Sequence, residues 1–167
     1  MQVYDKVCWT EVSEVSGKIE KINVPSHKPT AEQLPLAKKY TELHEAGKDS
    51  EIPYEGMMLT TVVAEAKRMV SLQNGPDFFT LPLTVIKVGE VAFVGFPGEP
   101  FTEIGRAVKD TDGYGLILPC CCANDARGYF PSSKAYSEGG YEASSSPFTT
   151  ALEQEYVDVL TNIFKKF

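Results

Sequence analysis

The sequence lacks the long apolar runs and the leader segment that mark membrane and exported proteins. Hydrophobic residues make up 43% of the chain, but no segment approaches the roughly 20 consecutive apolar residues that span a bilayer. The first residues, MQVYDKVCWTEV, contain neither a basic nor an apolar region, so they do not resemble a signal peptide. We therefore expect a soluble, cytoplasmic protein without a transmembrane segment.

Positive charge is also scarce. The chain has 16 Lys and Arg residues against 23 Asp and Glu residues, which gives a net charge of −7. The basic residues are scattered along the sequence instead of clustering on one predicted face. A chain of this charge repels a phosphate backbone, so we do not expect nucleic acid to be a partner.

Cysteine is rare, and its spacing is not that of a metal site. The four cysteines are Cys8 and the run Cys120-Cys121-Cys122, with no CxxC or CxxH motif. Adjacent residues of a strand point to opposite faces, so this run does not form a zinc knuckle. We expect buried, reduced thiols that fill small spaces in the core, as in a reducing compartment.

What the sequence does contain predicts a mixed α/β fold in one domain, residues 1–167. An imperfect alternation of apolar and polar residues over 11–24 predicts a strand at a sheet edge, with a break near Gly17. Two strands at about 81–88 and 91–96 flank the turn Gly89-Glu90 and form a hairpin, and a further buried strand covers 115–122. Helices are expected at about 30–47, with Thr30 as its cap, and at about 55–72, 100–110 and 148–166, the last beginning at Pro147.

Polar side chains follow two of these buried strands at the point where each strand ends. The segment Phe96-Pro97-Gly98-Glu99 delivers a carboxylate, and the segment from Cys122 to Tyr129 delivers an amide, an acid, a guanidinium and a phenol. Ligands often bind where strands end, and these two strands would lie side by side. Each segment also has a plain structural explanation, because a carboxylate is favoured in the first turn of a helix and tyrosine-rich loops often pack on the surface.

These residues resemble the neutral, non-lysosomal ceramidase family and its bacterial relatives of unassigned substrate. The resemblance lies in PGEPFTEIGRAVKD and in the segment ANDARGYFPSSKAYSEGGYEASSSPF, and it is strongest over about residues 80–150. The matching pattern has three parts in order. Pro-Gly-Glu is followed by an aromatic residue, an Asn is followed by a Tyr five positions later, and the sequence Tyr-Glu-Gly or Tyr-Glu-Ala comes after both. It is carried here by Pro97, Gly98, Glu99, Phe101, Asn124, Tyr129, Tyr141, Glu142 and Ala143.

The resemblance implies a zinc-dependent amidohydrolase that hydrolyses an N-acyl amide with a zinc-activated water. It implies that Glu99 and Tyr129 are zinc ligands. Tyr141 would lie near the substrate carbonyl and stabilise the oxyanion or position the substrate. Asn124 and Arg127 would hold the loop or contact the substrate, which would be a small-molecule or lipid amide.

The family's zinc site also requires two histidines in motifs that this chain lacks. Its only histidines are His27, in the turn PSHKPT, and His44, at the end of a predicted helix. Neither is expected to bind zinc. The chain therefore resembles the C-terminal portion of a larger catalytic domain, and we expect it to be inactive alone.

Three interpretations remain open at this stage. The chain is part of a zinc amidohydrolase, or it is part of a related hydrolase that acts on a non-lipid amide or an ester. Alternatively, it is a non-catalytic binding or structural domain whose tyrosine-rich loop recognises a partner. If part of the catalytic domain lies outside this chain, strands and apolar faces are left uncovered, so we expect self-association or binding of a complementary N-terminal half.

Overall fold

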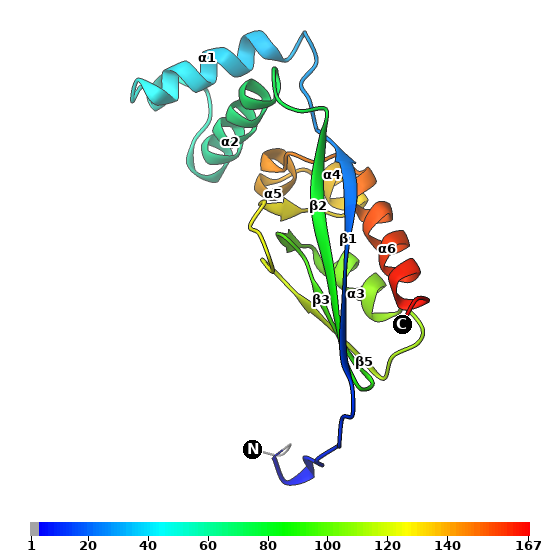
Figure 1. Cartoon of the computed structure of the whole chain (residues 1–167). Helices are drawn as coiled ribbons and strands as arrows, with labels where there is room; N and C mark the ends of the chain where they lie inside the picture. The colour runs from blue at the N-terminus through cyan, green and yellow to red at the C-terminus, as the bar shows by residue number, and fades with distance from the viewer. Residues whose placement is uncertain (1–3) are drawn as a thin grey trace.

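A four-stranded mixed sheet forms the centre of the computed structural model, which describes residues 4–167 (Figure 1). The strand order is β1-β2-β3-β5, with β1 antiparallel to β2, β2 antiparallel to β3, and β3 parallel to β5. The strands are β1 (Val15–Pro25), β2 (Phe78–Val88), β3 (Val91–Gly95) and β5 (Leu116–Cys120). The mixed α/β class and the hairpin around Gly89-Glu90 are confirmed.

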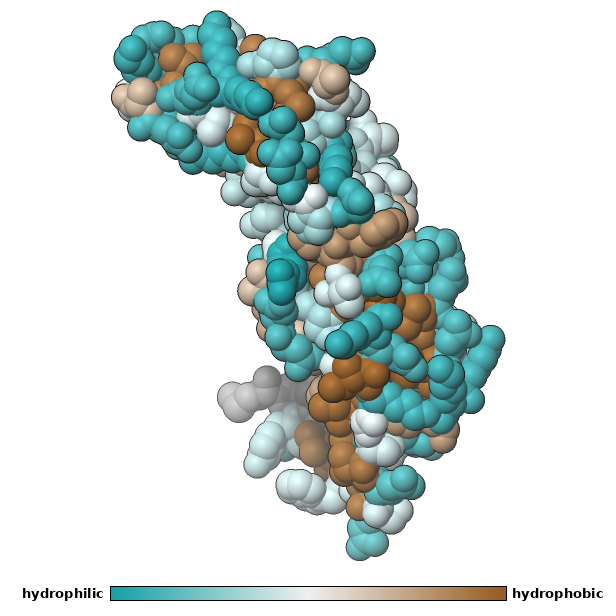
Figure 2. Space-filling view, turned by 45° about the horizontal axis from the view of Figure 1, so that its top comes forward, coloured by the Kyte–Doolittle hydropathy of each residue, from teal (hydrophilic) through white to brown (hydrophobic). Residues whose placement is uncertain are grey.

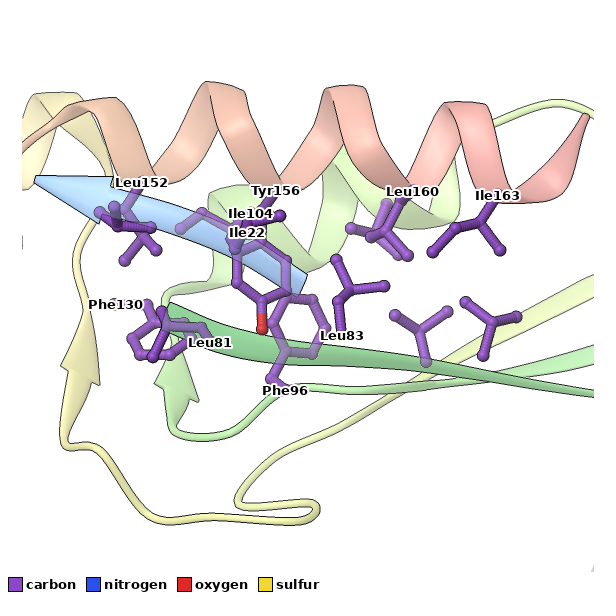
Figure 3. Packing of buried hydrophobic residues seen from close by; sticks show 14 of the residues in the cluster. Ile22, Leu81, Leu83, Phe96, Ile104, Phe130, Leu152, Tyr156, Leu160 and Ile163 are labelled. Atoms are coloured by element: carbon purple, nitrogen blue, oxygen red, sulfur yellow. The ribbon is translucent and has the colours of Figure 1, made fainter. Parts of the chain in front are cut away.

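Helices cover one face of this sheet. Both α3 (Thr102–Lys109) and α6 (Ala151–Phe164) pack on it, α3 against β5 and α6 against β1 and β2. In Figure 3, the side chains of Leu152, Tyr156, Leu160 and Ile163 descend from α6 onto Leu81 and Leu83 of the sheet. Because these α6 residues recur every three or four positions, they form one apolar face. The main core therefore lies between α6, α3 and the sheet.

A helical hairpin extends beyond the end of the sheet, at the top of Figure 1. It consists of α1 (Leu34–Glu45) and α2 (Gly56–Leu72), with the short helix η2 (Asp49–Glu51) between them. The hairpin has a hydrophobic cluster of its own, built on Ala37, Tyr40, Ile52, Val63, Ala66 and Met69. It contacts the rest of the molecule chiefly through α2, which packs against α5 (Tyr141–Ser145).

The remaining elements are short. They are η1 (Tyr4–Lys6) at the N-terminal end, the paired strands β4 (Glu99–Pro100) and β6 (Tyr129–Phe130), and α4 (Ser133–Glu138). The sequence did not predict β4, β6 or α5. Among residues 4–167, no helix is long and apolar enough to cross a membrane.

Several element boundaries differ from the predictions. The strand β1 begins only at Val15 and runs unbroken through Gly17, which pairs with Ile86, although its place at a sheet edge is confirmed. Thr30 does not cap α1, which begins at Leu34 after a turn. Pro147 does not start α6, because the next residue, Phe148, forms a β-bridge with Ser26. The helix begins at Ala151, three residues after Phe148.

The strand β5 is not a buried central strand as predicted. It lies at the edge of the described sheet, and Leu116 on its uncovered face is exposed. The prediction of buried cysteines is also wrong. Cys8, Cys121 and Cys122 are exposed and Cys120 is half-buried, because Cys8 precedes the sheet and the other three end the edge strand or follow it in a turn. All four are free thiols.

Candidate functional site

Glu99 and Tyr129 are opposite each other in a two-stranded parallel pair. They are register partners in β4 and β6, 30 residues apart in the sequence. The Glu99 N–H donates to the Gly128 carbonyl at 2.9 Å, and the Phe101 N–H donates to the Phe130 carbonyl at 3.0 Å. The structure therefore brings together the two residues that the resemblance implies as metal ligands.

The segment before Glu99 is held against the loop that follows β5. The Cys122 N–H donates to the Gly98 carbonyl at 2.9 Å, and the Arg127 N–H donates to the Pro97 carbonyl at 2.8 Å. A Cβ atom at position 98 would lie 2.5 Å from the Gly128 carbonyl oxygen and 2.7 Å from Cε1 of Phe130. Only glycine allows this approach, which explains the Gly of the Pro-Gly-Glu motif.

Tyr141 lies beside this pair. Its ring contacts the ring of Tyr129 edge to face, with centroids 6.1 Å apart. Tyr141 begins α5, and the two residues before it, Gly139 and Gly140, have φ values of 80° and 103° that favour glycine. The Gly-Gly pair thus turns the chain so that Tyr141 faces Tyr129. Glu99, Tyr129 and Tyr141 form one cluster on the surface, which we call the tyrosine-glutamate cluster.

The electrostatics of this cluster favour the protonated form of Tyr129. The negative charge of Glu99 raises the pKa of Tyr129 above its ordinary value, and burial, Tyr141 and Glu142 raise it further. Burial is the main cause of the raised pKa of Cys121, whose thiol also experiences the charge of Glu99. A carboxylate beside a phenol favours the neutral phenol, whereas a cation bound between them would reverse that preference.

Asn124 is bonded to the sheet, and Arg127 is bonded within its own loop. The Asn124 amide donates to Oγ1 of Thr84 at 2.7 Å, and its backbone has a φ of 72°, a region that asparagine tolerates. Arg127 Nε donates to Asp125 Oδ2 at 2.5 Å. The first bond holds the loop against β2, and the second fixes the shape of the loop itself. No hydrogen bond within residues 4–167 joins either side chain to Glu99 or Tyr129.

A buried polar network behind the cluster was missed by the sequence reasoning. The Ser146 hydroxyl, almost fully buried, donates to the Tyr129 carbonyl at 3.0 Å. The Tyr136 hydroxyl donates to the Phe148 carbonyl at 2.7 Å and lies 2.9 Å from Ser146 Oγ. Ser146 belongs to a run of serines, and nothing in that run distinguishes the buried one.

Arg68 extends this network to the helical hairpin. It lies on α2 and is only 7% exposed, and burial lowers its pKa. Its Nε donates to the Ser144 carbonyl at 2.7 Å, and its Nη1 donates to the His27 carbonyl at 2.5 Å. Glu65 lies 3.8 Å away as an ion-pair partner. Arg68 therefore joins α2 to the end of α5, the helix that begins with Tyr141.

The two histidines occupy other places. The His27 ring meets Tyr136 edge to face, its Nδ1 is buried without a hydrogen-bond partner, and burial followed by the charge of Arg68 lowers its pKa. His44 Nδ1 lies 2.8 Å from Asp49 Oδ1. Within residues 4–167, no group of three His, Cys, Asp or Glu side chains is placed to hold a metal.

Zinc therefore fits the tyrosine-glutamate cluster only in part. Carboxylate and phenol oxygens are suitable donors, but protein zinc sites need three or four protein ligands. Glu99 and Tyr129 supply two. The described residues do not complete a zinc site.

Comparison with known proteins shows structural similarity to neutral ceramidases. No family model and no curated protein matches the chain. One similar structure is the crystal structure of neutral ceramidase from Pseudomonas aeruginosa. The match covers 93% of this chain and 29% of the ceramidase chain, with 16% sequence identity and a TM-score of 0.52. The match to a structure of ceramidase complexed with C2 covers 53% of this chain and 15% of the ceramidase chain, with 22% sequence identity and a TM-score of 0.46. The chain thus spans less than a third of the length of either ceramidase that it matches.

Proposed function

We propose that this chain is part of a zinc-dependent amidohydrolase that hydrolyses an N-acyl amide, with Glu99 and Tyr129 as two of the zinc ligands. The observation that carries the proposal is the direct opposition of these residues in β4 and β6, with Tyr141 against Tyr129. The remaining ligands would come from polypeptide outside this chain. The similarity to a larger ceramidase supports this division, since this chain corresponds to a part of that fold.

In the complete site, zinc would supply Lewis acidity and a bound water of lowered pKa. The contribution of this chain would be to hold Glu99 and Tyr129 in register and to place the Tyr141 phenol beside them. A phenol is a hydrogen-bond donor that can stabilise an oxyanion on the substrate carbonyl. Asn124 and Arg127 would act mainly by holding the loop, and either would have to exchange its present partner to contact the substrate.

The test is elemental analysis of zinc in this chain and in the longest protein that its gene encodes. We expect the longer form to hold about one zinc ion, as a catalytic site does, and Glu99→Ala to remove it. Glu103→Ala, on the exposed side of α3 four residues away, is the matched control and should retain the metal. A longer form that binds no zinc, or binds it equally after Glu99→Ala, would contradict the proposal.

Two alternatives are separated by further measurements. A hydrolase acting on a non-lipid amide or an ester would bind zinc in the same way but would differ in substrate profile. A non-catalytic binding domain is favoured by the incomplete ligand set within residues 4–167. That domain would bind no zinc in either form, and its tyrosine-rich loop would act as the contact surface.

We also propose that the uncovered sheet face associates with another polypeptide, either a second copy or a complementary N-terminal half. The register places Val15, Val88, Val91 and Leu116 in one row across the four strands, and Gly17, Ile86, Phe93 and Leu118 in the next. Val15 and Ile19 of β1 are 66% and 67% exposed. Figure 2 shows hydrophobic side chains at the surface of the lower half of the molecule, where the sheet lies. A contiguous apolar face of this kind is typical of an interaction surface.

The assignments to one domain and to the cytoplasm remain parts of this proposal. The four free cysteines support a reducing compartment, because disulfides form in oxidising ones.

A further inference from the structure

A cavity of about 300 Å³ lies between the helical hairpin and Tyr141. Residues of α2, the end of α1 and the start of η2 line it, and Tyr141 of the tyrosine-glutamate cluster is also part of the lining. The Tyr141 ring thus has two neighbours, the cavity and the ring of Tyr129. The cavity and the tyrosine-glutamate cluster therefore share one residue, Tyr141.

The wall on α2 is apolar at its centre. Leu59, Val63 and Ala64 lie on one side of the helix at spacings of four and one. Val63 is part of the hydrophobic cluster of the hairpin, and Leu59 packs against that cluster. A short apolar group would be desolvated against these side chains.

The polar lining carries one cation that is not neutralised. His44 and Asp49 are hydrogen bonded to each other at 2.8 Å, so the Asp49 carboxylate already has a partner. Lys67 lies in the same lining on α2, two turns beyond Thr60. No ion pair within residues 4–167 includes Lys67. An ammonium group in the lining of a mostly apolar cavity favours a ligand with an anionic end.

The size of the cavity limits the ligand. Pockets for small molecules range from about 300 to 1,000 Å³, and this one is at the lower end. Its volume matches a short chain. Arg68 holds α2 against the carbonyl at the end of α5, so the wall and Tyr141 keep their relative position.

We infer that this cavity is a substrate subsite that binds a short aliphatic group ending in a carboxylate. The inference rests on the proposed function and adds a substrate class to it: an N-acyl amide whose short chain carries an anion, as opposed to a long-chain lipid amide. Leu59 and Val63 contact the chain, Lys67 pairs with the carboxylate, and Tyr141 marks the end that faces the scissile carbonyl.

The test measures the binding of hexanoate, and of its neutral counterpart hexanamide, to the full chain without metal. Binding is monitored by the amide signals in ¹⁵N NMR spectra. We expect hexanoate to shift the amide signals of Leu59, Val63, Lys67 and Tyr141 and to bind more tightly than hexanamide. Lys67→Met should weaken hexanoate binding about tenfold, the loss of one charge-assisted hydrogen bond, and leave hexanamide binding unchanged. Lys39→Met is the matched control, because it removes the same charge from the hairpin outside the cavity.

A second variant fills the cavity. Thr60 is exposed and lines it, so Thr60→Trp should abolish binding of both compounds without disturbing the core. Equal binding of hexanoate and hexanamide, an unchanged affinity in Lys67→Met, or shifts confined to other surfaces would overturn the inference. Because no metal is present, this result is independent of the zinc measurement, which tests the proposed function itself.

Discussion

At Gly98 the chain has no room for a side chain. We expect Gly98→Ala to destabilise the protein by about 1–3 kcal/mol, because the new methyl group would meet the Gly128 backbone, which has to shift. The same change would separate Glu99 from Tyr129. The measurement is urea-induced unfolding, with Gly105→Ala as the control.

Gly105 lies inside α3, and a Cβ atom added to it would meet no other residue within 4 Å. Alanine there should stabilise the protein by about 0.5–1 kcal/mol, because glycine is a poor helix former. If both substitutions changed the free energy of unfolding equally, a side chain at position 98 would not clash with the Gly128 backbone.

The carboxylate of Glu99 is the main cause of the raised pKa of Tyr129. The negative charge of Glu99 disfavours the phenolate, and Glu99→Gln removes that charge. The pKa of Tyr129 should therefore fall toward its ordinary value of about 10. Titration of ¹³Cζ-labelled tyrosine by NMR reports this directly and needs no metal. Glu103→Gln should leave the Tyr129 titration where it was, and an unchanged pKa in Glu99→Gln would mean that the two side chains do not interact in solution.

At the scale of elements, the position of α5 depends on α2. Arg68→Met would leave the carbonyls of Ser144 and His27 without their charged donor, at a cost of about 3 kcal/mol. Hydrogen exchange should then become faster in α5 and at the facing side of α2, while β2 and β3 keep their protection. Arg68→Lys keeps one charged donor and should restore part of the protection; uniform loss of protection in both variants would argue against a local role.

At the scale of the whole molecule, α6 and α3 cover one face of the sheet and the other face is open. We expect this chain to sediment as a dimer or larger species at micromolar concentration, because burying the apolar rows is favourable. Phe93→Lys places a charge at the centre of the open face and should shift the population to monomer with an unchanged circular dichroism spectrum.

Leu36→Lys is the control for this experiment. Leu36 is an exposed apolar residue of the hairpin, away from the sheet, so its replacement should not alter the sedimentation. A folded wild-type chain that remains strictly monomeric would contradict self-association, and would leave a complementary polypeptide as the proposed partner.

The local sequence pattern was sufficient to predict the elements whose structure depends mainly on their own residues. The apolar spacing of α2 and α6 and the turn between β2 and β3 could be recognised because helical and hairpin geometry repeat along the sequence. The adjacency of β3 and β5 was also expected, and with it the meeting of the segments that contain Glu99 and Tyr129. The roles of these two residues in binding zinc remain a prediction.

Tertiary structure decided what depends on contacts between distant segments. The exposure of β5 and the cysteines follows from which sheet face and edge the helices leave open, and an apolar run looks the same in a central strand and in an edge strand. The burial of Ser146 and Arg68, and the cavity beside Tyr141, arise where α2 meets α5. The sequence by itself determined the longer helices, the β2–β3 hairpin and the motif residues, because their signals are local. Only the fold decided which residues become neighbours, because those residues are far apart in the sequence, as Arg68 and Ser144 are at 76 residues.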